Sequence, residues 1–253
     1  MRTIKKVASH IFIDGFGGMT QGLFATLIIG TMIQQIGLLI GGSTGNVIYL
    51  LGKAAAALTS AGIGVGVAVK YGESPLVTVS AAVAAMVGGY AGKITGGTFF
   101  VDGNAVLAGP GEPLGAFIAA FAGITCGHLV SGKTKVDIIV TPVITIGAGS
   151  VVGLLVGPPI SHMMTGLGSI INWATEQRPF IMGIVVSVVM GMVLTLPISS
   201  AALGIILNLS GLAAGAATIG CCCNMVGFAV ASYRENKFGG LVAQGLGTSM
   251  LQV

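Results

Sequence analysis

The residue with the clearest chemical potential is a carboxylate held among two glycines and two prolines. Glu112 lies in Gly109-Pro110-Gly111-Glu112-Pro113, at the start of an apolar run. Neither proline nor glycine suits the interior of a regular helix, so the pattern predicts that the backbone opens there. A carboxylate at such an opening could accept hydrogen bonds from solute hydroxyls or take up a proton; the alternative is an exposed acid beside a turn. We favour solute binding because residues 99–108 are apolar apart from Asp102 and Asn104.

Three further polar side chains stand inside or beside apolar runs: Gln21, Asn104 and His162. Amides both donate and accept hydrogen bonds, which suits the recognition of a sugar or a nucleobase, but they also join neighbouring helices within a membrane. His162 follows Gly157-Pro158-Pro159, where we expect a helix to break, and an imidazole there could bind a solute or carry a proton. The residues themselves leave these alternatives open.

The chain lacks the motifs of the common catalytic and cofactor sites. It has no Walker loop, no glycine-rich dinucleotide turn, no HExxH and no GxSxG. Its four cysteines are Cys126 and the run Cys221-Cys222-Cys223, which lack the CxxC spacing of a zinc or redox centre. We expect these cysteines to be small buried side chains, and we expect no metal site, no cofactor and no catalytic residue in this chain.

The composition indicates that lipid surrounds these residues. Of 253 residues, 54% are apolar and 7% are charged, and the mean hydropathy is +0.98. A soluble domain carries about 25% charged residues because its surface must be hydrated, so a chain this poor in charge needs a bilayer as its solvent. The net charge of +4 is scattered, without the basic stripe that nucleic-acid binding requires.

The apolar runs predict an all-α, polytopic membrane protein with about seven to eight transmembrane or re-entrant helices. The expected crossings are residues 16–40, 47–69, 75–92, 114–130, 137–156 and 179–196. Residues 198–231 are too long for one crossing and predict two short crossings or a re-entrant hairpin. Residues 162–176 are more polar and predict an amphipathic helix in the membrane interface. The basic residues of the loops place the N-terminus in the cytoplasm.

Glycine is about twice as frequent as usual, with 43 residues. A spacing of four residues lets helix backbones approach closely, and it recurs at Gly62 and Gly66, Gly88 and Gly92, Gly149, Gly153 and Gly157, and Gly211 and Gly215. We expect close packing there, the alternative being helix breaks around a binding site. Residues 16–23 and 238–246 are also alike, which predicts an internal repeat unless glycine-rich low complexity produces the match.

Several segments carry a resemblance to a known family: Gly166–Trp173, Arg178–Gly183 and Leu194–Ala202. They resemble the membrane subunit IIC of the bacterial phosphotransferase system. The chain is also similar to a IIC-like branch that includes perfringolysin-regulator-type membrane proteins. The segments that carry this similarity are Gly109–Gly115 and Gly245–Met250. The resemblance implies a sugar-binding membrane domain, a soluble IIB-type phosphocarrier protein as partner, and a homodimer. Many IIC subunits have a histidine in the segment that matches Leu196–Ser200, where this chain has Ser199 and Ser200, and no IIA or IIB domain is fused here.

We therefore expect residues 1–253 to form one IIC-like domain in the bacterial cytoplasmic (inner) membrane, acting as a permease subunit for a small polar solute, by resemblance a sugar. The alternatives are a membrane regulator without transport activity and an ion-coupled secondary carrier. The expected solute-binding residues are Glu112, Gln21, Asn104, His162 and Ser199. Val253 ends an apolar stretch without a polar flank, and family members are longer, so we expect a chain truncated at its C-terminal end.

Overall fold

The structure, a computed structural model, describes residues 14–194 except 102 and 108, then residues 204, 207, 209–242 and 244–245. Ser199, one of the expected solute-binding residues, lies outside this described part. The chain divides into two compact units, of which the first ends at His162 and the second begins at Met163. Each unit is described by itself.

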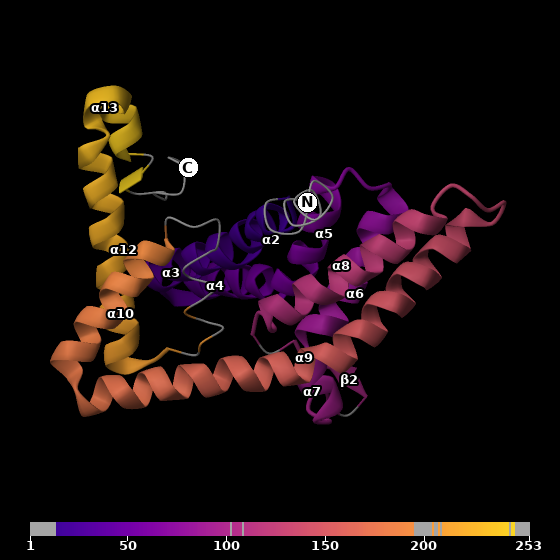
Figure 1. The fold of residues 1–253 in the computed structure, drawn as a ribbon, viewed down its shortest axis with the longest axis horizontal. Coiled ribbons are helices and arrows are strands. Elements are labelled where there is room, and N and C mark those ends of the chain that lie inside the picture. Colours follow the sequence, from indigo (N-terminus) through magenta and orange to yellow (C-terminus); the bar gives the residue numbers. More distant parts are fainter. Residues whose placement is uncertain are drawn as a thin grey trace, which may run out of the picture. The chain divides into compact units, whose positions relative to one another are not determined.

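The first unit begins with a long helical hairpin. One arm runs through α2 (Phe16–Leu23), the π-helix η2 (Phe24–Ile28) and α3 (Ile29–Ile40). The other returns beside it as α4 (Gly42–Ala57) and α5 (Thr59–Lys70), so that α4 packs on α3 and α5 packs on α2 (Figure 1). Gly41 and Gly42 form the turn with φ of +66° and +64°. The returning arm bends by 53° between α4 and α5.

Glycines line the contact between the two arms along its whole length. Gly37 faces Gly45, Gly30 faces Gly52, Gly22 faces Gly62 and Gly18 faces Gly66. A Cβ atom added at Gly18, Gly22, Gly30 or Gly37 would come within 3 Å of the opposite backbone. The predicted close packing at Gly62 and Gly66 is therefore confirmed, and it extends over the entire hairpin.

Three more helices complete the first unit. α6 (Pro75–Gly89) packs on α5 and on α8 (Pro113–Val130), and the first part of α9 (Asp137–Gln177) lies beside α8 (Figure 1). α6 and α8 each begin with a capping side chain followed by proline, the usual start of a helix. Between them lie α7 (Ala91–Thr95) and an antiparallel pair of short strands, β1 (Phe100–Val101) and β2 (Asn104–Ala105).

The predicted close packing is also found at the glycines of α6 and α9. Cβ atoms at Gly88, Gly149, Gly153 and Gly157 would each fall within 3 Å of a neighbouring helix. Gly92, in α7, is looser, because a Cβ there would lie 3.8 Å from Ser161 Oγ.

α9 corrects two expectations, because it is a single helix of 41 residues. The predicted break after Gly157-Pro158-Pro159 is wrong, and residues 162–176 continue α9 instead of forming a separate amphipathic helix. Pro142, Pro158 and Pro159 all lie inside it. Proline removes one N–H from the helix, but neighbouring helices can keep a membrane helix continuous at such a position.

The second unit contains the end of α9 together with α10 (Pro179–Val193), α12 (Gly211–Ala231) and α13 (Tyr233–Val242). α10 packs on α12 through Val186, Met190 and Ala217. Close packing at Gly211 and Gly215 is not found, because a Cβ at either glycine would meet no atom within 4 Å. These two glycines instead line a groove between α10 and α12 with a volume of about 510 Å³.

The cysteines are less buried than expected. Cys126 and Cys221 are half-buried, whereas Cys222 and Cys223 are exposed on α12. Neighbouring positions on a helix point in different directions, so a run of three cannot be buried against one partner helix.

The lengths of the helices confirm the all-α, multi-pass architecture. Within the described residues, four apolar helical stretches are long enough to cross a membrane: Phe16–Ile40, Pro113–Val130, Asp137–Met163 and Gly211–Ala231. The bent pair α4 and α5 makes a fifth when it is counted as one span, and α6 and α10 are shorter apolar helices. In the expected double crossing over residues 198–231, α12 accounts for one crossing, and much of the stretch before it lies outside the described residues.

Candidate functional site

Glu112 lies at the N-cap of α8. Its Oε1 accepts a hydrogen bond from the N–H of Leu114 (3.1 Å), and its Oε2 accepts one from the N–H of Gly115 (2.5 Å). A carboxylate in this position satisfies free N–H groups of the first turn and interacts favourably with the helix dipole. The predicted opening of the backbone is present, and the side chain's nearest partners are those of its own helix.

The loop before Glu112 is joined to a bend in the membrane helices. Ser60 follows the bend between α4 and α5, and its hydroxyl donates a hydrogen bond to the carbonyl of Pro110 (2.9 Å). Ser60 has no exposed surface. This bond connects two segments that are 50 residues apart in sequence.

The same loop is joined to the end of α6. The hydroxyl of Tyr90, the residue after α6, lies within hydrogen-bond distance of the carbonyls of Ala57 (3.2 Å) and Gly109. The N–H of Glu112 donates to the carbonyl of Gly89 at 2.7 Å. Residues 57–60, 89–90 and 109–112 thus meet in one place, which we call the three-way junction.

Gly111 shows how tightly the three-way junction is packed. Its φ is +76°, and a Cβ atom there would lie 3.1 Å from the carbonyl oxygen of Gly89. Glycine adopts this backbone conformation without strain and leaves room for the neighbouring carbonyl. The inner side of the junction, at Ser60 and Tyr90, is therefore polar, buried and filled by protein atoms, whereas Gly109 is exposed and Glu112 is half-buried.

Taken as one crossing, the bent pair α4 and α5 would hold the three-way junction near the middle of the bilayer. α5 has 12 residues and α4 has 16, which corresponds to lengths of about 18 Å and 24 Å. With α5 upright and α4 tilted by 53°, the pair spans about 32 Å, close to the hydrocarbon thickness of about 30 Å. The bend then lies about 18 Å from the Lys70 end, near the middle of the membrane. Polar groups at this depth are costly unless they are paired or functional.

The other expected solute-binding residues are more dispersed. Asn104 is exposed in β2, within the segment that links α6 to Glu112, and His162 is exposed on α9. His162 follows Ser161, which lies opposite Gly92 in α7, so α9 passes beside the end of the α6–α7 region (Figure 1). Gln21 is exposed on α2, the helix that packs on α5, and no described contact joins it to the three-way junction.

A comparison with protein families matches residues 13–253 to the phosphotransferase system, EIIC family. The match covers nearly the whole chain. The chain belongs to the phosphotransferase system EIIC family. Comparisons with curated proteins and with solved structures found no match. It is therefore a multi-pass membrane protein and a permease subunit of a phosphotransferase system.

Two residues of this EIIC subunit's three-way junction, Ser60 and Tyr90, were missed by sequence reasoning. Both are polar side chains within apolar stretches, and both are buried, with 0% and 1% of their surface exposed. Their hydroxyl groups bond to carbonyls that breaks in the helices have left free. A search for hydroxyl-bearing residues beside helix ends in apolar runs would have found them.

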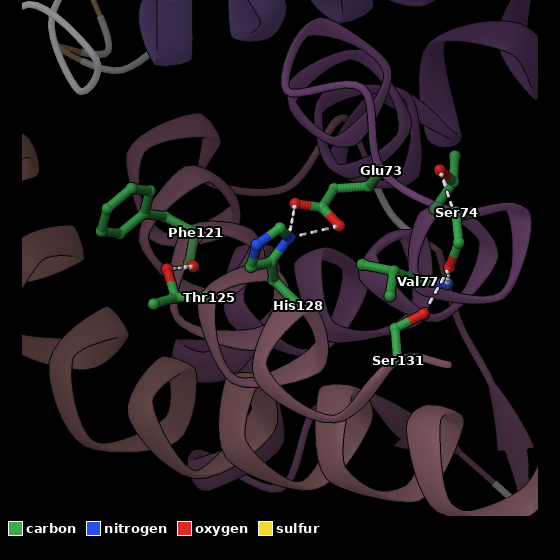
Figure 2. A network of polar contacts seen from close by, with 8 residues as sticks. Glu73, Ser74, Val77, Phe121, Thr125, His128 and Ser131 are labelled. Carbon is green, nitrogen blue, oxygen red and sulfur yellow. Dashed lines mark hydrogen bonds and ion pairs between the residues drawn. The ribbon is translucent and has the colours of Figure 1, made fainter. Parts of the chain in front are cut away.

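Side chains join the loop between α5 and α6 to the end of α8 and the residue after it (Figure 2). Nδ1 of His128 in α8 lies 2.9 Å from Oε1 of Glu73, whose side chain is only 9% exposed, whereas that of His128 is 70% exposed. Beside this pair the hydroxyls of Ser74 and Ser131 are 3.0 Å apart. Ser74 also caps α6 by accepting from the N–H of Val77.

Tyr71 lies next to this loop, at the end of α5. Burial, and to a lesser degree the Asp14 carboxylate, raise the pKa of Tyr71 to about 12. The phenol therefore stays protonated at physiological pH and can donate a hydrogen bond. Its ring packs edge-on against the ring of Phe121 in α8, with 6.3 Å between the ring centroids.

Proposed function

We propose that this EIIC subunit binds and translocates a small polar solute, a sugar, and that the solute is bound at the three-way junction with Glu112 as its principal polar contact. The observation that carries the proposal is the meeting of three helix breaks at the segment that ends with Glu112. Broken helices at membrane depth are the usual setting for solute sites in transporters.

Glu112 retains capacity for a ligand beside its role as a cap. An ionised carboxylate has about four acceptor positions, and one backbone N–H occupies each oxygen. A sugar hydroxyl could donate to either oxygen without displacing the cap. Entry would require the bond between Ser60 and Pro110 to open, because the junction is filled in the structure.

Asn104 and His162 are weaker candidates for the same path, since both lie in or beside the segments that close the junction. Gln21 and Ser199 stay predictions, the former on α2 and the latter outside the described residues. By analogy with the family, the phosphoryl group that is transferred to the sugar would come from a soluble IIB-type protein. The subunit would form a homodimer in the bacterial cytoplasmic membrane, with its N-terminus in the cytoplasm.

Substitutions at Glu112 can separate its role as the N-cap of α8 from its proposed contact with the solute. Glu112→Ser retains a good N-cap but removes the carboxylate, Glu112→Ala removes both, and Glu112→Gln keeps the shape without the charge. Equilibrium binding of a panel of labelled sugars to the purified chain, followed by uptake of the sugar that binds, gives the readouts. We expect Glu112→Ser to lose binding while keeping the stability of the unsubstituted chain, and Glu112→Ala to lose about 1 kcal/mol of stability as well.

Binding and uptake by Glu112→Ser at the level of the unsubstituted chain would show that Glu112 is only a cap. Ser60→Ala serves as the companion variant, because it removes one bond of the junction and leaves the carboxylate in place. If Glu112 binds the solute, Ser60→Ala should change the rate of uptake more than the affinity for the sugar.

A further inference from the structure

Lys53 is the one charged residue between Phe16 and Val69, the two arms of the first hairpin. It lies in α4, its side chain is exposed on the first unit, and within the described part of the chain it has no hydrogen-bond or ion-pair partner. A charge within a membrane-spanning segment is rare and marks a functional group by default.

The depth of Lys53 follows from the bend. Lys53 lies five residues before Leu58, so it is about 23 Å from the Lys70 end of the bent pair, measured across the membrane. About 8 Å of hydrocarbon then separates it from the far surface. In this orientation the Cα atom of Lys53 lies inside the apolar layer, in the half away from the loop of residues 71–74.

The packing of α3 on α4 settles which edge of the hairpin carries Lys53. Gly52 faces Gln34 and Gly30, and Gly45 faces Gly37, so these positions define the inner face of each helix. Positions seven and four residues apart on a helix share a side. The edge beside Lys53 carries most of the polar side chains, with Asn46 and Tyr49 from α4 and Thr31 and Gln35 from α3, together with the exposed Leu38 and Leu50. The opposite edge carries Ile33, Ile40, Ile48, Ala55 and Thr44.

We propose that Lys53 and the polar edge around it form a site for an anionic oxygen group, the carboxylate or phosphate of a solute or of a lipid headgroup. An ammonium group without a partner gains most from a charge-assisted hydrogen bond to such an oxygen. Tyr49, one turn before Lys53, and Asn46, two turns before it, add neutral donors of the kind that orient oxygen atoms. The site is separate from Glu112, and only its solute arm rests on the proposed transport function.

The experiment uses the purified full chain and two matched pairs of probes. The first pair is glucuronate and glucose at equal ionic strength, read by the thermal unfolding midpoint in detergent. The second pair is the acidic lipid phosphatidylglycerol and the neutral lipid phosphatidylcholine. The thermal unfolding midpoint of the protein is then measured in nanodiscs made of either lipid. Lys53→Met removes the charge and Lys53→Arg retains it. Lys70→Met, at the loop end of α5, controls for a general loss of positive charge.

We expect the acidic member of one pair to raise the midpoint more than its neutral counterpart in the unsubstituted chain, in Lys53→Arg and in Lys70→Met. In Lys53→Met the apparent affinity for that probe should fall roughly tenfold or more. A response to glucuronate assigns the site to a solute, and a response to phosphatidylglycerol assigns it to a lipid headgroup. If neither acidic probe depends on Lys53, the proposal is wrong, whatever the outcome for Glu112.

Discussion

Replacing Gly22 by alanine should destabilise the first unit by forcing the two arms of the hairpin apart. A Cβ atom at Gly22 would lie 2.5 Å from the carbonyl carbon of Gly62 and 2.7 Å from the nitrogen of Ile63. The carbonyl oxygen of Gly62 would be nearer still. Ordinary contact begins at 3.4 Å, so the helices must separate by at least about 0.9 Å, and the facing atoms are backbone that cannot rotate away.

The expected cost follows from two opposing effects. Overpacking a close contact costs about 1–3 kcal/mol, and the greater helix preference of alanine offsets up to about 1 kcal/mol of it. Gly147→Ala is the matched control, because Gly147 lies in a membrane helix of the same unit and a Cβ there meets nothing within 4 Å. It should be neutral or stabilising.

Unfolding of both variants in mixed micelles of mild detergent and sodium dodecyl sulfate, followed by far-ultraviolet circular dichroism, measures the difference. Gly22→Ala should unfold at a lower fraction of sodium dodecyl sulfate than the unsubstituted chain, and Gly147→Ala at an equal or higher one. A Gly22→Ala variant as stable as Gly147→Ala would refute the close backbone contact between α2 and α5.

Three further predictions concern single positions. Thr145 carries the one buried hydroxyl without a hydrogen-bond partner among the described residues, so Thr145→Val should keep or raise stability, by up to about 1–3 kcal/mol, in the same unfolding assay; a clear loss would mean that the hydroxyl has a partner. Gly111→Ala should lower both stability and sugar binding, because its φ is +76° and the added methyl would meet the Gly89 carbonyl; normal binding would argue against a tight junction. Cys222→Ala and Cys223→Ala should each change stability by no more than about 0.5 kcal/mol in the same assay, since both side chains are exposed on α12; a clear loss would mean that another part of the protein covers them.

The crossings could be predicted from sequence because lipid imposes a simple rule on them. Apolar runs of sufficient length gave the positions of α2–α3, α8 and the first part of α9, and the pairs Ser74-Pro75 and Glu112-Pro113 mark two helix starts through local capping chemistry. The glycine spacing at Gly62 and Gly66 also predicted a contact, since close approach needs small residues on both helices.

Other features depend on tertiary contacts that no local pattern reports. The bend between α4 and α5 occurs in a stretch rich in alanine, without proline or glycine at the break, and is held by the bonds of Ser60 and Tyr90. In α9 the local signal pointed the other way, because the prolines predicted a break where the helix continues. Gly211 and Gly215 have the same spacing as Gly62 and Gly66 but no facing backbone, since spacing says nothing about which helix is opposite.

The bend between α4 and α5 makes the hydrophobic length of the first unit adjustable. A straight pair would reach about 42 Å, whereas the bent pair spans about 32 Å. Lipids with longer acyl chains favour the straighter form, because a mismatch costs free energy for each ångström. Because Ser60 lies just after the bend, a change of the bend angle would strain its hydrogen bond to Pro110, the same bond that solute entry at the proposed site would open.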